Sequence, residues 1–207
     1  MKNINHLINQ GESDVLDFKK EISSALKIAK TIVAFANNKG GRLLIGIRDD
    51  KSIAGIKSEE EKYMIDLAVN FYCKPTPVVS ITTWKLQGKI VLEALIKEGT
   101  DKPYYAKAED DKWWVYIRVA DQSLLASKIT VDVLKRNAAQ TPATIKYSSK
   151  EEALFKLLHQ HKKITLNEFA QHINVSRWRA SKILVNLICI GVVREHTHEQ
   201  MPFYTLS

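Results

Sequence analysis

The 207-residue sequence has no apolar run near the roughly 20 residues that a membrane-spanning helix needs. Its first residues, Met1 to His6, lack the apolar block of a secretory signal, so we expect a cytoplasmic protein with no membrane partner. Cysteine occurs only at Cys73 and Cys189, which argues against a disulfide framework or a cysteine-based zinc site. Eight glycines and five prolines are too few for long flexible tracts.

Acidic residues are outnumbered by basic ones. The chain carries 31 Lys and Arg against 23 Asp and Glu, a formal net charge of +8. A basic balance favours polyanionic partners such as nucleic acid, because cationic side chains neutralise phosphates and release counterions. Many basic proteins have no such partner, so the functional argument depends on motifs.

The composition changes near residues 137–149, which are polar and small and include Pro142. This is the composition of a linker. We therefore expect a first domain over residues 1–141, a linker over 142–149 and a second domain over 150–207.

Patterning in the first part predicts a mixed α+β domain. Apolar residues at three-to-four spacing predict a helix over 22–37, and a mostly apolar run predicts a strand over 42–48. A second helix is expected over 58–72, opened by a capping box between Ser58 and Glu61.

Strands are expected to follow that helix. A hairpin is predicted around Gln87-Gly88, and an aromatic strand over 113–119. Adjacent residues of a strand face opposite sides, so we expect either Trp113 or Trp114 to lie in the core. The other could stack on a base or close a dimer interface.

The second part is predicted to contain three helices and a β-hairpin, the order of a winged helix-turn-helix. Thr165 and Glu168 form a capping box at the second helix, and Ser176 caps the third. The expected helices span 150–159, 165–173 and 176–190, and the expected strands 192–194 and 203–206.

The third helix of this part is the best candidate for contact with nucleic acid. At 100° per residue its apolar residues gather on one side. Trp178, Arg179, Lys182 and Asn186 lie on the other, with Arg177 in the first turn. Such a face suits base edges and phosphates. The alternative is a solvated face in a protein-interaction adaptor.

Two histidines near the end of the chain raise a separate possibility. His196 and His198 fall at alternate positions of the expected wing and could bind a metal. Two histidines on a loop usually do not form a metal site, so we expect none here.

Several segments of the first part resemble the Schlafen-type Alba-like domain. They are, in sequence order, Gly11 to Lys19, Ala34 to Gly41, Leu44 to Asp50, Ile53 to Ile56, Lys102 to Tyr105 and Tyr116 to Val119. The resemblance covers approximately residues 7–134. It departs at Ala120-Asp121, where the family commonly has Gly-Ser and where a glycine would let the backbone approach a phosphate.

This resemblance implies an α+β domain associated with nucleic-acid binding, in which we expect Lys19 and Arg118 to take part. Bacterial members with a C-terminal helix-turn-helix are described as transcriptional regulators. Animal Schlafens carry two copies of the domain, so a single-copy chain is expected to form a twofold homodimer. The main hypothesis is a dimeric DNA-binding regulator.

The resemblance also implies an alternative, a metal-dependent endoribonuclease acting on structured RNA, because Glu12, Asp17 and Asp49 match three catalytic acids of animal Schlafens. Two carboxylates about 4 Å apart repel by roughly 4 kcal/mol at an intermediate dielectric. Mg²⁺ or Mn²⁺ could relieve this repulsion and polarise a phosphate. Lys19 could instead neutralise Asp17, and Asp49 could serve a turn.

The turn at residues 37–41, Asn-Asn-Lys-Gly-Gly, does not have the spacing of a phosphate-binding loop, and its strand follows the glycines instead of preceding them. We therefore expect it to stop a helix, and we expect no ATP or other organic cofactor.

Overall fold

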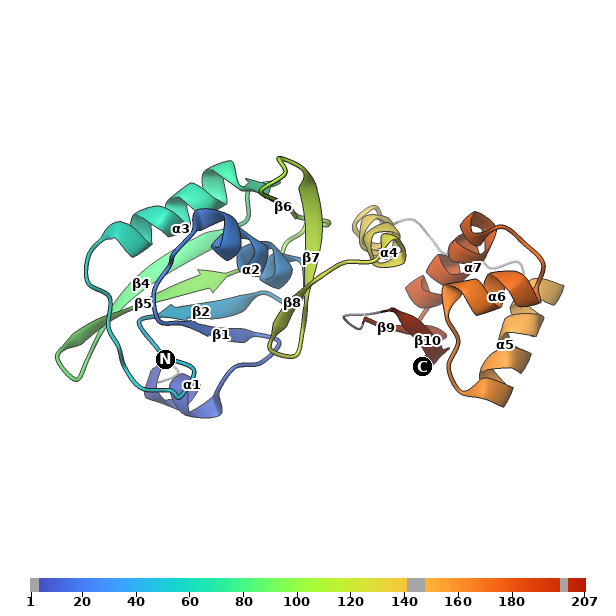
Figure 1. The fold of residues 1–207 in the computed structure, drawn as a ribbon, viewed down its shortest axis with the longest axis horizontal. Coiled ribbons are helices and arrows are strands. Elements are labelled where there is room, and N and C mark those ends of the chain that lie inside the picture. The colour runs from blue at the N-terminus through green and yellow to red at the C-terminus, as the bar shows by residue number, and fades with distance from the viewer. Residues whose placement is uncertain (1–3, 141–147, 198–200) are drawn as a thin grey trace. The chain divides into compact units, whose positions relative to one another are not determined.

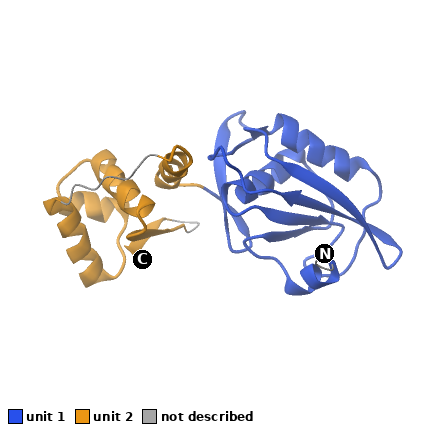
Figure 2. Ribbon diagram, turned by 180° about the vertical axis from the view of Figure 1, so that it is seen from behind, with its two compact units in different colours: residues 1–125 blue, residues 126–207 orange. Residues whose placement is uncertain are grey.

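The computed structural model describes residues 4–140, 148–197 and 201–207. Contacts divide the chain into two compact units, unit 1 over residues 1–125 and unit 2 over 126–207 (Figure 2). The sequence placed the boundary later, at 141/142, and most of its expected linker lies outside the described residues.

Unit 1 is a mixed α+β domain, as expected (Figure 1). Its elements are α1 (Ile4–Gln10), β1 (Leu16–Lys19), α2 (Ala25–Asn37), β2 (Gly41–Ile45), α3 (Glu60–Phe71), β3 (Cys73–Lys74), β4 (Val79–Leu86), β5 (Lys89–Ile96), β6 (Tyr105–Lys107), β7 (Trp113–Val119) and β8 (Gln122–Leu125).

Two four-stranded sheets make up the β structure of unit 1. The first has the order β1-β2-β5-β4, with β1 parallel to β2 and the other pairs antiparallel. The second has the order β3-β6-β7-β8 and is antiparallel throughout.

Helix α2 packs against both sheets, in one core with residues of β2, β5 and β6. Every residue from Thr31 to Asn37 is buried, so the second half of the helix is covered on all sides, more than the one buried face that its spacing predicts. Helix α1 covers the opposite face of the first sheet, where Leu7 and Ile8 share a second core with Phe18.

Helix α2 stops at the turn over residues 37–41, as predicted, and the chain reverses tightly there. Buried Asn37 fastens the helix to the second sheet: its Nδ2 donates to the carbonyl oxygens of Tyr104 (2.8 Å) and Tyr116 (2.9 Å). Gly40 has a φ of +74°, and a Cβ there would lie 2.7 Å from the backbone oxygen of Ile96. Only glycine fits this reversal.

Helix α3 begins later than its predicted capping box. Glu59 is the N-cap and makes no side-chain cap hydrogen bond. The Ser58 hydroxyl accepts from the amide of Glu60 at 3.2 Å, so it does not pair with Glu61 in a box. That capping prediction is wrong.

Unit 2 follows the predicted element order, with one addition. Its elements are α4 (Lys128–Ala138), α5 (Ser149–His161), α6 (Leu166–His172), α7 (Arg177–Cys189), β9 (Val193–His196) and β10 (Phe203–Leu206). β9 and β10 are antiparallel. The capping box of Thr165 and Glu168 is present as predicted.

The added element is α4, which the sequence assigned to the first domain. Ile129 of α4 is buried in the core of unit 2, and Val133 packs against that core. Burial of this apolar side places α4 with the second unit.

Candidate nucleic-acid interface

The exposed first half of α7 has the predicted basic and aromatic character. Ser176 caps the helix, its hydroxyl accepting from the amide of Arg179 at 3.3 Å. Arg177, Arg179 and Lys182 are exposed, and Trp178 is 63% exposed. The Lys182 ammonium lies 5.9 Å from the centroid of the Trp178 ring. This part of the helix offers cations beside a flat aromatic surface.

Asn186 is placed differently from the other predicted residues of this face. Its Oδ1 accepts a hydrogen bond from the Arg136 guanidinium of α4, and the residue is only partly exposed. Helical periodicity placed Asn186 on the polar side of α7 but contains no information on the neighbouring helix that binds it, and its predicted contact with nucleic acid stays a prediction. The candidate surface is therefore the first two turns of α7: Arg177, Trp178, Arg179 and Lys182.

Helix α4 is held to the rest of unit 2 at both ends. Near its start, Glu195 of β9 accepts from the hydroxyls of Ser127 at 2.6 Å and Thr130 at 2.8 Å. Near its end, Arg136 donates to Asn186. A glutamate in the expected wing would oppose phosphate if it faced a nucleic acid. The Glu195 carboxylate instead binds the start of α4.

Glu12 and Asp17 lie close together in unit 1. The Phe18 amide donates to Glu12 Oε1 at 2.8 Å, and strand β1 buries Asp17. Burial raises the pKa of Glu12, and the neighbouring Asp17 carboxylate adds to the effect, although the Phe18 amide opposes it. Two of the three predicted acids are thus neighbours.

Asp49 is not brought to this pair. The parallel register sets Asp17 opposite Leu43, and Asp49 lies beyond the end of β2 in an exposed turn. In the same turn, hydrogen bonds from Ser52 lower the pKa of Asp50. Across the part of the chain that the structure describes, no three His, Cys, Asp or Glu side chains are grouped to hold a metal ion. His198 lies outside that part.

Cations already neutralise Asp17. Arg118 Nη2 lies 2.9 Å from Asp17 Oδ1, and Lys19 Nζ lies 2.8 Å from Asp17 Oδ2. The two side chains of the Arg118–Asp17 pair are 2% and 4% exposed. Lys19 is 42% exposed.

Arg118 makes two further contacts inside unit 1. Its Nε donates to the carbonyl oxygen of Ser13 at 3.1 Å, and its guanidinium lies 5.0 Å from the Phe35 ring centroid. The predicted contact of Arg118 with nucleic acid does not fit this burial. Lys19 keeps a half-exposed side chain, and its predicted contact stays a prediction.

Ala120 stands where the chain departs from the family pattern, and its backbone conformation favours the family's glycine. Ala120 has a φ of +52°, in the left-handed region that favours glycine. The family's glycine at this place therefore suits the backbone of the β7–β8 turn.

Trp113 and Trp114 are 39% and 40% exposed, so the expectation that one lies in the core is wrong. Both stand at the start of β7, beside the turn where the Ala108 amide donates to the Lys112 carbonyl at 2.8 Å. Tyr116, further along the strand, packs against the core.

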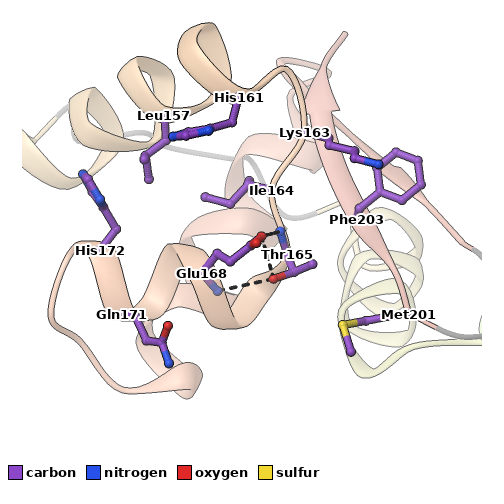
Figure 3. Close-up of a pocket in the computed structure, with 10 residues that line it drawn as sticks. All are labelled: Leu157, His161, Lys163, Ile164, Thr165, Glu168, Gln171, His172, Met201 and Phe203. Atoms are coloured by element: carbon purple, nitrogen blue, oxygen red, sulfur yellow. Dashed lines mark hydrogen bonds between the residues drawn. The ribbon is translucent and has the colours of Figure 1, made fainter.

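Two cavities flank the start of α6 in unit 2. Figure 3 shows the larger, about 860 Å³, lined by His161, Lys163 and His172 among others. Its Glu168 carboxylate turns toward Thr165, whose amide and hydroxyl lower the pKa of Glu168. The second cavity, about 390 Å³, adjoins Trp178.

The structure defines a two-unit protein. An α+β domain is followed by a small, mostly helical unit that carries an exposed basic helix. The model of the family described as Schlafen, AlbA_2 matches residues 12–127. The chain therefore belongs to this family, as its motifs predicted. The matched region ends close to the boundary of unit 1.

Two solved structures are similar to the chain. One is the DIP2311 protein from Corynebacterium diphtheriae, at 16% identity and a TM-score of 0.49, with 70% of this chain and 35% of that chain covered. The other is the N-terminal domain of a RecG-related protein from Nitrosomonas europaea, at 21% identity and a TM-score of 0.43, with 62% and 97% covered. This chain spans about a third of the first protein. No curated protein matches the sequence.

Among the helices that the structure describes, none is long and apolar enough to cross a membrane.

Proposed function

We propose that this protein binds DNA through the first two turns of α7, and that unit 2 is a winged helix-turn-helix. The exposed group of Arg177, Trp178, Arg179 and Lys182 carries the proposal. Exposed guanidinium groups can bind phosphates and guanine edges, and the indole ring offers a face for stacking or packing. Within the described residues, Arg177, Arg179 and Lys182 form no ion pair, so their charges are available to a ligand.

The order of elements in unit 2 supports the winged assignment. Helices α5, α6 and α7 precede the β9–β10 hairpin, and residues 173–176 connect α6 to α7. Ile164, between α5 and α6, forms an antiparallel bridge with Tyr204 of β10. In a helix-turn-helix the second helix of the pair enters the major groove with its N-terminal residues first, and α7 presents its cations at that end.

Membership of the Schlafen AlbA_2 family and the net charge of +8 both support a nucleic-acid-related function. The regulatory role and the twofold dimer are further parts of the proposal. Sedimentation velocity tests the proposed dimer. We expect a species of about twice the mass of one chain.

The nuclease alternative gains no support from the described geometry. It requires Asp49 beside Glu12 and Asp17, and Asp49 lies in a separate exposed turn. We therefore place DNA binding first.

Binding to labelled, pooled genomic DNA fragments at low salt tests the proposal. Arg179→Ala and Lys182→Ala should each weaken binding and lower the slope of log K against log salt by about 1. Lys156→Ala is the matched control, because this exposed lysine lies on α5, another helix of the same unit, and pairs there with Glu152 of the same helix. Unchanged affinity in both α7 variants would overturn the proposal, and tighter binding to an RNA hairpin would move it from DNA to RNA.

A further inference from the structure

The smaller cavity of unit 2 is lined by residues of four elements. Helix α4 forms one wall, and the starts of α6, α7 and β10 form the others. Its volume of about 390 Å³ falls within the range of small-molecule sites.

The α4 wall of this cavity is fixed in place. Glu195 binds the hydroxyls of Ser127 and Thr130 at one end of the helix, and Arg136 binds Asn186 at the other. Ile129, which lines the cavity, is 3% exposed and belongs to the core of unit 2. A wall held by core packing and by hydrogen bonds at both ends gives a preformed site, which reduces the ordering cost of binding.

The lining combines positive charge with apolar surface. Lys128, Arg177 and Lys182 contribute three cations, against the one carboxylate of Asp132. Within residues 4–140, 148–197 and 201–207, none of these four groups forms an ion pair. An anion placed among the cations would supply the missing counter-charge.

The apolar part of the lining is partly aromatic. The Trp178 ring lines the cavity near the Lys182 ammonium, and Leu166, Pro202 and buried Tyr204 add apolar surface. An aromatic ring that bears a carboxylate would satisfy both parts at once, its ring against the apolar surface and its charge near Lys182 or Arg177.

We propose that this cavity is a binding site for a small aromatic carboxylate. The site shares Arg177, Trp178 and Lys182 with the surface proposed for DNA. An occupied cavity therefore competes with DNA for these side chains. The competition rests on the proposed function, whereas the binding of the carboxylate does not.

Isothermal titration of the full chain with 2-naphthoate tests the site, with the neutral 2-naphthamide as the matched ligand. Saturable binding of one naphthoate per chain is expected, with at least tenfold weaker binding of the amide. Lys182→Ala should weaken naphthoate binding about tenfold, and Asp132→Asn should strengthen it because it removes the neighbouring negative charge. Lys163→Ala alters the larger cavity and should leave the affinity for naphthoate unchanged.

No saturation at millimolar naphthoate would overturn the site, as would equal binding by the Lys182→Ala variant. Equal binding of the amide and the carboxylate would overturn the assignment of an anion. In the DNA assay, saturating naphthoate should weaken binding by the wild type. If the chain binds naphthoate but no DNA at all, the proposed function fails while the site stands.

Discussion

The buried pair of Arg118 and Asp17 allows a quantitative test of where Arg118 acts. Removing one partner of a buried ion pair typically costs about 3–5 kcal/mol, because the other charge is left without compensation. Both side chains here are at most 4% exposed, and the remaining ion pair of Asp17, to half-exposed Lys19, is screened by solvent and compensates the buried charge only weakly, so we expect Arg118→Met to cost a similar amount. With a urea dependence of about 2 kcal/mol per molar, the midpoint of unfolding should fall by about 2 M.

Tryptophan fluorescence in a Trp178→Phe background measures unit 1 alone, because the other three tryptophans, Trp84, Trp113 and Trp114, all lie in that unit. Lys19→Met is the control, since its half-exposed ion pair to the same carboxylate should contribute only about 1 kcal/mol or less.

Replacing Asp17 with Asn in the Arg118→Met variant should recover part of the loss, because the buried charge, which Lys19 alone compensates only weakly, is then gone. A midpoint shift for Arg118→Met no larger than that for Lys19→Met would refute the reasoning. Arg118 would then return as a candidate contact for nucleic acid.

Three further predictions concern local features. Ala120→Gly should raise the free energy of unfolding of unit 1 by about 0.5–1 kcal/mol, the relief of left-handed strain less the added unfolded-state entropy, and a thermal melt that shows no gain would contradict it. Because burial raises the pKa of Glu12, its ionisation disfavours the folded state as pH rises from the ordinary to the raised pKa. Glu12→Gln should therefore gain stability over wild type above that window and match it below, whereas exposed Glu109→Gln should show no such trend. Glu195→Ala should speed hydrogen exchange of the α4 amides and leave α2 unchanged, and equal protection of α4 in both proteins would show that Glu195 does not hold the helix.

Local rules predicted local features of this chain well. The capping box of Thr165 and Glu168 and the cap at Ser176 are both present, because each depends on residues within one helical turn. The same rule failed at Ser58, where the helix begins after Glu59 and the serine is no longer the N-cap. A capping pattern thus indicates a helix start more reliably than its exact register.

Tertiary neighbours account for the remaining errors. Periodicity placed Asn186 on the polar side of α7, but nothing in that pattern indicates that Arg136 lies against it. The spacing of Glu12, Asp17 and Asp49 likewise does not show where β2 ends. The strand stops at Ile45, so Asp49 lies in the turn beyond it and not beside Asp17. Burial of Arg118 depends on its pairing with Asp17, about a hundred residues away in sequence.

The salt dependence of DNA binding tests the central claim most directly. For the wild type, log K should fall linearly with log salt. Replacing both Arg179 and Lys182 with alanine should lower that slope by about 1.8, because each phosphate that is no longer neutralised removes about 0.9. Parallel lines for the wild type and the double variant, at equal affinity, would contradict the assignment of α7 as the DNA-binding helix.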